Sequence, residues 1–405
     1  MVSIAILGNG VVGSGVVEVI EKNKKENINI SKILVKDKNK HKHNKLFSII
    51  TEDIKEVIEE DTNIIVEAIG GIEPAYDYVK AFLKAKRHVV TANKDLISKH
   101  GEELLKIAKE NNVKLYFEAS VGGGGIPILR PMKECLVGND VKGIKAVLNG
   151  TTNFILTKMH KEGITFENAL ITAQELGFAE SDPTSDIKGY DSARKLAILS
   201  NLAYDKKFNW ENFNIEGIDK IDEYDIEMAN KLGGVIKLVA ISEKFPNGIY
   251  TAVKPAIISK DSMLSKVENE FNSIIIEGED VGEVAFYGKG AGKLPTASAI
   301  YSDIMNIINN KKEKDLLFNN ENAVIFREFP KEKNWVIRIS TEYRTEVICS
   351  INRLFKKVYV YSKDYFSKKE IFAIVYNENE KNLKNKLDSI PNINKLKTTI
   401  VLSQS

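Results

Sequence analysis

The chain has 405 residues, enough for two or three domains that each bury a core. The 58 basic and 56 acidic residues nearly cancel to a net charge of +2, which argues against nucleic acid as a partner. No apolar run reaches the roughly 18 residues that a membrane helix needs. We see no basic leader before the first strand. The two cysteines lie far apart in the sequence, which suits a reducing compartment. We therefore expect a cytoplasmic protein without a membrane partner.

The first 145 residues alternate short apolar runs with helical stretches. The strands that we expect are Val2–Leu7, Ile30–Val35, Ile64–Ala68, His88–Thr91 and Lys114–Phe117, with helices at Gly13–Lys22, Ala75–Ala85 and Gly101–Asn111. This alternation predicts an α/β dinucleotide-binding domain of Rossmann type, with a doubly wound parallel sheet.

The pattern changes at about residue 146. Residues 146–290 read as an α+β domain, with expected elements at Ile144–Leu148, Asp191–Tyr204, Ala252–Ile258 and Ser273–Glu277. A polar linker at Lys311–Asp315 and Asn319–Asn322 leads to a third unit at 325–405. There the expected elements are Trp335–Ser340, Glu346–Phe355, Val358–Tyr361, Ile371–Val375, Leu383–Ser389 and Lys397–Leu402, the β-α-β-β-α-β order of ferredoxin-like domains.

The first loop of the chain, Gly8-Asn9-Gly10-Val11-Val12-Gly13, has the spacing of a phosphate cradle. A lone glycine motif equally fits a plain turn, but here a strand precedes it and a helix follows. Gly8 allows the tight turn, Gly10 admits the pyrophosphate, and Gly13 lets helix and strand pack closely. We expect a nicotinamide dinucleotide at the N-terminus of the helix.

The end of the second strand bears on the choice between the two nicotinamide cofactors. An acid here binds the ribose hydroxyls of NAD, whereas a basic residue suits the additional phosphate of NADP. The sequence offers Lys36, Asp37 and Lys38 in succession. This favours NADP, with NAD as the alternative.

The stretch GFAESDPTSDIKGYDSARK, residues 177–195, is the second candidate site. It can be read as a solvated acidic loop with a surface Asp191–Lys195 pair worth about 0.3–0.5 kcal/mol, and its spacing does not fit a calcium loop. A helical wheel favours another interpretation, because Asp191 and Lys195 share a stripe with Ile198, Leu199 and Leu202, whereas Arg194 and Asn201 point elsewhere. An inward-facing carboxylate and ammonium suit proton transfer.

Six separated motifs together resemble homoserine dehydrogenase. Besides the glycine loop and the acidic stretch, they are Val90-Thr-Ala-Asn-Lys94, Glu118-Ala-Ser-Val121 with Ile126-Pro127, Leu148-Asn-Gly-Thr-Thr-Asn153, and Gly288-Lys-Gly-Ala-Gly-Lys-Leu-Pro-Thr-Ala297. The resemblance implies reversible NAD(P)H-dependent reduction of aspartate 4-semialdehyde to homoserine, in threonine, methionine and isoleucine biosynthesis. It also implies that about 291–312 complete the nucleotide domain, and that 146–290 form the catalytic and dimerisation domain of a homodimer.

The resemblance implies roles for individual residues. Lys195 would protonate the new hydroxyl, beside Asp191 and with Lys94 between cofactor and substrate. The substrate-binding residues would be Glu180, Asp186, Asp191, Gly150 and Thr151. The cofactor would contact Gly8, Asn9, Gly10, Val11, Val12, Gly13, Lys36, Thr91, Lys94, Gly177 and Gly290.

Two departures from the family pattern affect these assignments. The loop Val121-Gly-Gly-Gly-Gly-Ile126 has one additional glycine, so Glu118, Val121, Gly123 and Ile126 are the expected ligands of a monovalent cation such as Na⁺, with a flexible turn as the alternative. Residues 330–405 resemble an ACT regulatory domain, but Tyr343-Arg-Thr-Glu346 lacks the glycine that admits an amino-acid effector. A structural or dimerising role is the alternative for this unit. Two rival functions are a different amino-acid dehydrogenase and a non-catalytic dinucleotide sensor.

Overall fold

The computed structural model describes residues 2–23, 27–122, 124–309, 321–361 and 369–402. Its contacts divide the chain into two compact units. Residues 1–144, 191–212 and 270–323 make up the first unit, and residues 145–190, 213–269 and 324–405 make up the second. The polar linker predicted at Lys311–Asp315 lies outside the described residues, as do the first two residues of Asn319–Asn322.

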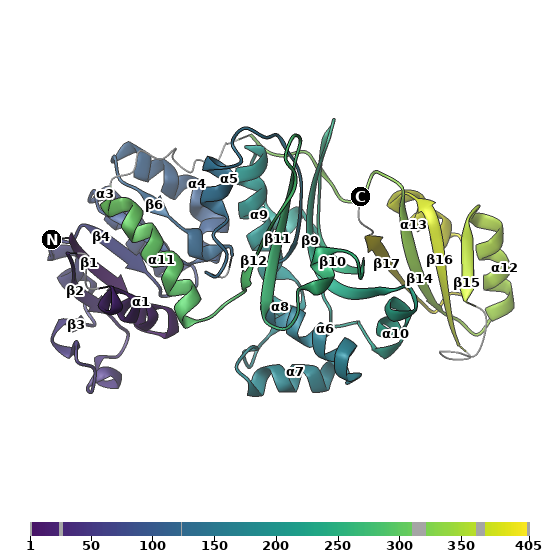
Figure 1. Cartoon of the computed structure of the whole chain (residues 1–405), viewed down its shortest axis with the longest axis horizontal. Helices are drawn as coiled ribbons and strands as arrows, with labels where there is room; N and C mark the ends of the chain where they lie inside the picture. The colour runs from purple at the N-terminus through teal and green to yellow at the C-terminus, as the bar shows by residue number, and fades with distance from the viewer. Residues whose placement is uncertain (1, 24–26, 123, 310–320, 362–368, 403–405) are drawn as a thin grey trace. The chain divides into compact units, whose positions relative to one another are not determined.

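A six-stranded parallel sheet forms the centre of the first unit (Figure 1). Its order is β3-β2-β1-β4-β5-β6, and all five pairs of neighbouring strands are parallel. The strands are β1 (Val2–Leu7), β2 (Ile28–Leu34), β3 (Ile50–Thr51), β4 (Ile64–Glu67), β5 (His88–Thr91) and β6 (Leu115–Tyr116). The predicted doubly wound parallel sheet is therefore confirmed.

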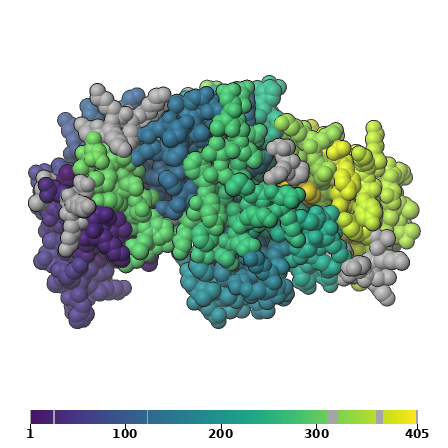
Figure 2. All heavy atoms as spheres, viewed as in Figure 1, coloured from purple at the N-terminus to yellow at the C-terminus, as the bar shows by residue number. Residues whose placement is uncertain are grey.

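Successive side chains of each strand point to opposite faces of the sheet, and both faces are apolar, so helices cover them. Ile4 and Ile6 of β1 lie in one buried cluster with residues of two helices, α1 (Val11–Lys22) and α11 (Lys293–Ile308). In Figures 1 and 2 the green α11 lies against the purple α1, although some 270 residues separate them in the chain. The other helices of residues 1–144 include α2 (Ile54–Glu59), α3 (Ala75–Lys84), α4 (Lys94–Glu110) and α5 (Leu129–Glu134).

Helix α4 starts seven residues before the predicted Gly101–Asn111. Gly101 is buried inside α4, where a glycine costs roughly 1 kcal/mol relative to alanine, so it was misread as a helix boundary. The true start is set by Asn93, whose side chain accepts a hydrogen bond from Leu96 N at 3.0 Å. Lys94 is consequently the first residue of a helix.

The second unit contains a mixed sheet whose long hairpin consists of β9 (Gly234–Phe245) and β10 (Gly248–Ser259). Strand β17 (Lys395–Leu402) runs parallel to β10, and the order continues through β14 (Lys333–Ser340), β16 (Glu370–Glu378) and β15 (Val358–Tyr361). The helices of this unit are α6 (Gly150–Glu162), α7 (Phe166–Glu175), α8 (Thr184–Ile187), α10 (Glu223–Lys231), α12 (Arg344–Leu354) and α13 (Glu380–Asp388).

The C-terminal elements follow the order β14, α12, β15, β16, α13, β17, which is the predicted β-α-β-β-α-β sequence of elements. Contacts place them in one unit with residues 145–190 and 213–269, because β17 extends the sheet of β9 and β10. The buried pair Lys254–Glu380, at 2.8 Å, also joins β10 to α13. The division into domains at 1–145, 146–290 and 325–405 remains a prediction.

Four elements lie at or near the changes of unit. They are β7 (Val141–Val147), α9 (Tyr190–Tyr204), β11 (Phe271–Gly278) and β12 (Gly282–Lys289). From Asp191 onward, α9 belongs to the first unit, together with the hairpin of β11 and β12. The expected elements at Ile144–Leu148, Asp191–Tyr204 and Ser273–Glu277 overlap β7, α9 and β11.

Candidate active site

The glycine loop connects β1 to α1 in the geometry that a dinucleotide requires. Gly8 has a φ of +99°, and a Cβ there would lie 2.6 Å from the Ala68 carbonyl oxygen. A Cβ on Gly13 would lie 1.9 Å from Gly8 O, whereas one on Gly10 would meet nothing within 4 Å. Close packing thus accounts for Gly8 and Gly13, and Gly10 borders the open space that a pyrophosphate would occupy.

Polar atoms without partners adjoin this open space. No side chain caps the N-terminus of α1 at Gly10, so its first N–H groups remain available to an anion. Asn9 Oδ1 is buried without a hydrogen-bond partner, while Asn9 Nδ2 lies 3.4 Å from His41 Nδ1. Val11 is 68% exposed and Val12 partly exposed. The loop therefore fits the phosphate groups of a nicotinamide dinucleotide.

The residues after β2 leave the choice of cofactor open. Lys36 is exposed, and the carboxylate of Asp37 accepts a hydrogen bond from Asn39 N at 2.9 Å. Asp37 thus caps the short helix Lys38–His41, and the Lys38 amine lies 4.8 Å from the centre of the Phe47 ring. The Lys36 amine is the group here that could meet a ribose phosphate.

Glu67 is a buried carboxylate that contacts Thr91, an expected cofactor residue, and the sequence analysis missed it. It ends β4, is fully buried, and accepts a hydrogen bond from the Thr91 hydroxyl. Its other oxygen accepts a bond from Ile69 N at 2.8 Å, and Thr91 Oγ1 in turn accepts one from Asn93 N at 2.9 Å. Glu67 thereby fixes Thr91 and the start of α4. The carboxylate that closes the apolar run Ile64-Ile-Val-Glu67 was the available signal.

Asp191 lies between two lysines in the first unit. Its Oδ1 is 3.0 Å from Lys94 Nζ and its Oδ2 is 2.8 Å from Lys195 Nζ. Asp191 is 3% exposed and Lys195 7% exposed, whereas the Lys94 side chain is one-third exposed. A buried charge requires a partner of opposite sign, and the carboxylate supplies one to both amines. The arrangement can deliver a proton to an oxygen that gains negative charge.

The helical wheel anticipated this arrangement in part. Asp191 and Lys195 are buried together with Ile198, Leu199 and Leu202, as predicted. Asn201, which the helical wheel places away from this stripe, is also buried, at 5% exposure, and accepts a hydrogen bond from Phe208 N at 2.7 Å. The reason is that α9 is buried on more than one face, so a single apolar stripe does not describe it.

The described glycines on either side of Gly123, in the loop after Glu118, are closely packed. Glu118 is 7% exposed and accepts hydrogen bonds from Ile128 N, Leu129 N and Arg130 N at 2.5, 2.8 and 3.1 Å. Burial raises the pKa of its carboxyl group, and these backbone donors oppose the shift. Cβ atoms on Gly124 and Gly125 would lie 2.1 Å from Thr296 Cα and 2.3 Å from Lys289 O.

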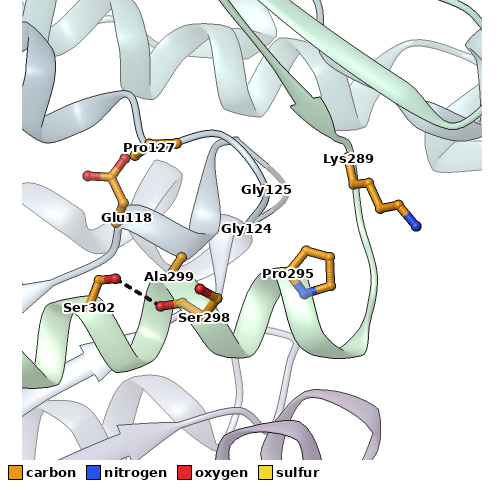
Figure 3. A pocket seen from close by; sticks show the side chains of 9 residues that line it. All are labelled: Glu118, Gly124, Gly125, Pro127, Lys289, Pro295, Ser298, Ala299 and Ser302. Atoms are coloured by element: carbon orange, nitrogen blue, oxygen red, sulfur yellow. Dashed lines mark hydrogen bonds between the residues drawn. The ribbon is translucent and has the colours of Figure 1, made fainter. Parts of the chain in front are cut away.

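A cavity of about 380 Å³ adjoins this loop, and Figure 3 shows the Glu118 carboxylate at its edge, with the Lys289 amine directed away from the loop. Val121 and Ile126 are buried, and Gly123 lies outside the described residues. In the described part of the chain, no three His, Cys, Asp or Glu side chains gather to hold a metal ion. A cation here would therefore rest on Glu118 and backbone carbonyls.

Gly290 follows β12, and a Cβ there would lie 2.4 Å from Asn272 Oδ1. Asn272 is fully buried, and both polar atoms of its amide lack a hydrogen-bond partner. A buried amide whose polar atoms have no partner costs free energy. Sequence reasoning missed this contact between Asn272 and Gly290, because a single asparagine in a strand carries no distinguishing pattern.

The expected substrate residues Gly150, Thr151, Glu180 and Asp186, together with Gly177, belong to the second unit. Asn149 caps α6 by accepting a hydrogen bond from Thr152 N at 2.8 Å, and its amide donates to Asp186 Oδ1 at 2.7 Å. Thr151 Oγ1 donates to Phe178 O at 2.6 Å. Asn149 thus ties Asp186 to the start of α6.

The other members of this group are more open. Glu180 and Gly177 are both exposed, and Gly177 has a φ of +76°. The acidic stretch therefore contains the short helix α8 and the start of α9, with the Glu180 carboxylate exposed and Asp191 buried.

Comparisons with known proteins cover nearly the whole described fold. Residues 8–118 match the family "Homoserine dehydrogenase, NAD binding domain" and residues 127–305 match "Homoserine dehydrogenase". A homoserine dehydrogenase of Bacillus subtilis (strain 168) is 42% identical over 320 residues, which are 77% of this chain and 74% of that protein.

Two solved structures are similar over the backbone. The crystal structure of a homoserine dehydrogenase from Thiobacillus denitrificans has a TM-score of 0.90 at 30% identity, covering 99% of this chain and 98% of its own. A hyperthermophilic archaeal homoserine dehydrogenase in complex with NADPH has a TM-score of 0.66 at 32% identity, covering 77% and 99%. Among the described helices, none is long and apolar enough to cross a membrane.

Proposed function

The chain belongs to the homoserine dehydrogenase family, and from that premise we propose that it reduces L-aspartate 4-semialdehyde to L-homoserine, reversibly, in the biosynthesis of threonine, methionine and isoleucine. The observation that carries the proposal is the buried contact of Lys195 with Asp191, which Lys94 shares. A rival dehydrogenase of the same nucleotide fold or a dinucleotide sensor has no chemical need for a buried ammonium of this kind.

Lys195 acts as the general acid in this proposal. The reduced nicotinamide, when bound, supplies a hydride to the carbonyl carbon of the aldehyde. The carbonyl oxygen then gains negative charge, and the Lys195 ammonium both stabilises that charge and donates the proton. Asp191 holds the amine in place through the 2.8 Å contact, and Lys94 bonds the other oxygen of the same carboxylate.

Recognition of the substrate falls to the acidic residues and the start of α6. Glu180, with its exposed carboxylate, binds the substrate ammonium group, and Asp186 assists from its position beside Asn149. Gly150 and Thr151 line the substrate site. Two carboxylates suit the ammonium of a zwitterionic amino acid.

NADP is the proposed cofactor, with NAD as the alternative. The open space beside Gly10 and the uncapped start of α1 support binding of the pyrophosphate. Lys36 is available for the additional phosphate of NADP. We place Thr91, Gly177 and Gly290 near the nicotinamide end of the cofactor. The family relative in complex with NADPH supports the same choice. A monovalent cation, Na⁺ for preference, is proposed at Glu118 and the carbonyls of Val121, Gly123 and Ile126.

The remaining assignments rest on the resemblance and the element order. We propose a cytoplasmic homodimer built through the second domain, and an ACT-like fold for the elements from β14 to β17. Activity measured across a threonine titration tests amino-acid control, and a flat curve would exclude control by threonine.

The catalytic proposal has a direct assay. Homoserine and oxidised cofactor are mixed with the protein, and the absorbance of the reduced nicotinamide is followed, with NADP and NAD in separate series. Turnover with homoserine but not with other hydroxy amino acids supports the proposal. Cofactor binding without turnover would favour the dinucleotide sensor, and turnover only with another substrate would favour the rival dehydrogenase.

A further inference from the structure

A small cavity in the second unit is lined by basic side chains that the proposed reaction does not use. Its volume is about 240 Å³, and it lies among α6, α10, β9 and the turn that precedes β11. Lys161, Lys237 and Lys260 line it with His160, and Glu268 is the single acidic residue of the lining. Because Glu268 already pairs with Lys161 at 2.5 Å, the cavity has an excess of positive charge.

Lys237 is the centre of this excess. It is 3% exposed, and its amine donates to Asn153 Oδ1 at 2.8 Å and to Val267 O at 2.5 Å. Both acceptors are neutral, and among the described residues no carboxylate forms an ion pair with Lys237. Burial lowers the pKa of this amine to about 8, so it is still largely protonated at neutral pH. A buried ammonium with only neutral partners is costly unless an anion joins it.

His160 adds a second donor to the same cavity. Its Nε2 accepts a hydrogen bond from Ile236 N at 2.8 Å, which places the proton of the neutral ring on Nδ1. His160 Nδ1 is buried, and the side chain of Asn230, which also lines the cavity, interacts with the ring. Lys260 is exposed and also lines the cavity, and its charge acts on the His160 ring, so its amine is a third donor. Donors from three elements thus line one small space.

We propose that this cavity binds a compact oxyanion, either phosphate or the carboxylate of a small acid, between Lys237, His160 and Lys260. The volume excludes a nucleotide, since ligand pockets for larger molecules begin at about 300 Å³. Charge-assisted hydrogen bonds from Lys237 and Lys260 bind the anion, and the N–H group of His160 completes its coordination.

The site is separate from the residues proposed for the substrate, although both lie on α6. Thr151 and His160 are nine residues apart on this helix, which is about 14 Å at 1.5 Å per residue. Asn153 lies between them and links α6 to Lys237 through its side-chain oxygen. The proposal therefore does not depend on the assigned catalytic roles.

Isothermal titration of the full-length protein with inorganic phosphate, in a non-coordinating buffer of constant ionic strength, tests the proposal. Saturable binding is expected. The Lys260→Gln substitution is at an exposed position and should leave the fold intact. It should weaken phosphate binding about tenfold or more, which is the loss typical of one hydrogen bond to a charged group. Lys158→Gln is the matched control, because Lys158 lies on α6 but pairs with Glu162 outside the cavity. It should bind phosphate as the wild type does.

A parallel titration with succinate distinguishes a carboxylate site from a phosphate site. Tighter binding of either anion identifies its class, provided that Lys260→Gln weakens it. Lys237→Met, checked for folding by circular dichroism, should abolish binding of both anions. Absence of saturable binding, or equal binding by wild type and Lys260→Gln, would overturn the proposal.

Discussion

Lys195 Nζ lies 2.8 Å from Asp191 Oδ2, one turn earlier on α9, and both residues are buried. The spacing of four residues is common on helix surfaces, where such a pair contributes only about 0.3–0.5 kcal/mol. Burial makes the pair more important, because each buried charge is costly unless the opposite charge of the other group compensates it. The contact of Lys94 with the other oxygen of Asp191 makes the carboxylate the link between α4 and α9.

Replacing Lys195 by Met should lower kcat by a factor of about 10²–10⁴, the range typical of a lost general acid. The affinity for the reduced cofactor should change little, because the glycine loop is untouched. Stopped-flow turnover together with fluorescence titration of the cofactor measures both quantities. Lys188→Met is the control, since Lys188 pairs with Asp219 and has no proposed role. Normal turnover of Lys195→Met would show that another group donates the proton.

Two glycines of the first loop should respond differently to the same substitution. Gly13→Ala places a methyl group 1.9 Å from Gly8 O, so we expect a lower unfolding free energy as well as loss of cofactor binding. Gly10→Ala meets open space, so the protein should stay folded and lose only affinity for the dinucleotide. Thermal unfolding and cofactor titration of both variants test this. Equal cofactor affinity in Gly10→Ala and wild type would contradict the proposed position of the pyrophosphate.

Lys36→Ala tests the choice of cofactor. If the Lys36 amine binds the additional phosphate, KM for NADP should rise about tenfold or more, and KM for NAD should stay constant. Initial rates against each cofactor measure the two constants, with Lys40→Ala as a control in the same loop. A parallel rise for both cofactors would mean that Lys36 affects the loop rather than the phosphate.

The sequence predicted the parallel sheet, the glycine loop and the inward direction of Lys195 because each depends on local periodicity and spacing. The strand bounds at Val2–Leu7 and His88–Thr91 agree with the structure residue for residue. Glu67 and Asn272 were missed because their roles depend on tertiary neighbours, Thr91 and Gly290, that lie 24 and 18 positions away. The basic cavity was missed for the same reason, since its lysines come from separate elements.

His160 should make stability depend on pH. Burial, and then the charge of Lys237, lower its pKa to about 4 from an ordinary 6.5, while the Asn230 side chain opposes the shift. The unfolded chain therefore binds more protons between pH 6.5 and 4, so the stability contribution is complete above pH 6.5 and is lost as the pH falls toward 4. The loss is on the order of 3 kcal/mol. Phosphate-free denaturant unfolding of wild type and His160→Gln across this range measures it.

The His160→Gln variant should have a shallower dependence of unfolding free energy on pH, although its absolute stability can also fall because the ring's contact with Ile236 N is lost. The slope rather than the stability at one pH is therefore the informative quantity. His43→Gln, in an exposed loop, provides the matched control and should keep the wild-type slope. Identical slopes for wild type and His160→Gln would mean that His160 titrates alike in the folded and unfolded chains.

Glu380 and Lys254 form a pair that connects the C-terminal elements to β10. Both residues are buried, with Glu380 3% exposed and Lys254 6% exposed. Glu380 also accepts a hydrogen bond from Phe329 N at 2.8 Å. Lys254→Met leaves the carboxylate buried without its ammonium, so we expect a loss of about 3–5 kcal/mol of unfolding free energy. The double variant Lys254→Met/Glu380→Gln removes both charges and should recover part of that loss.

Chemical denaturation of the two single variants and the double variant completes a thermodynamic cycle for this pair. Lys384→Met is the control, because its amine lies 3.7 Å from the same Glu380 but its side chain is 45% exposed, and an exposed pair contributes little. If Lys254→Met were no more destabilising than Lys384→Met, the attachment of α13 to β10 would rest on apolar packing and strand pairing alone.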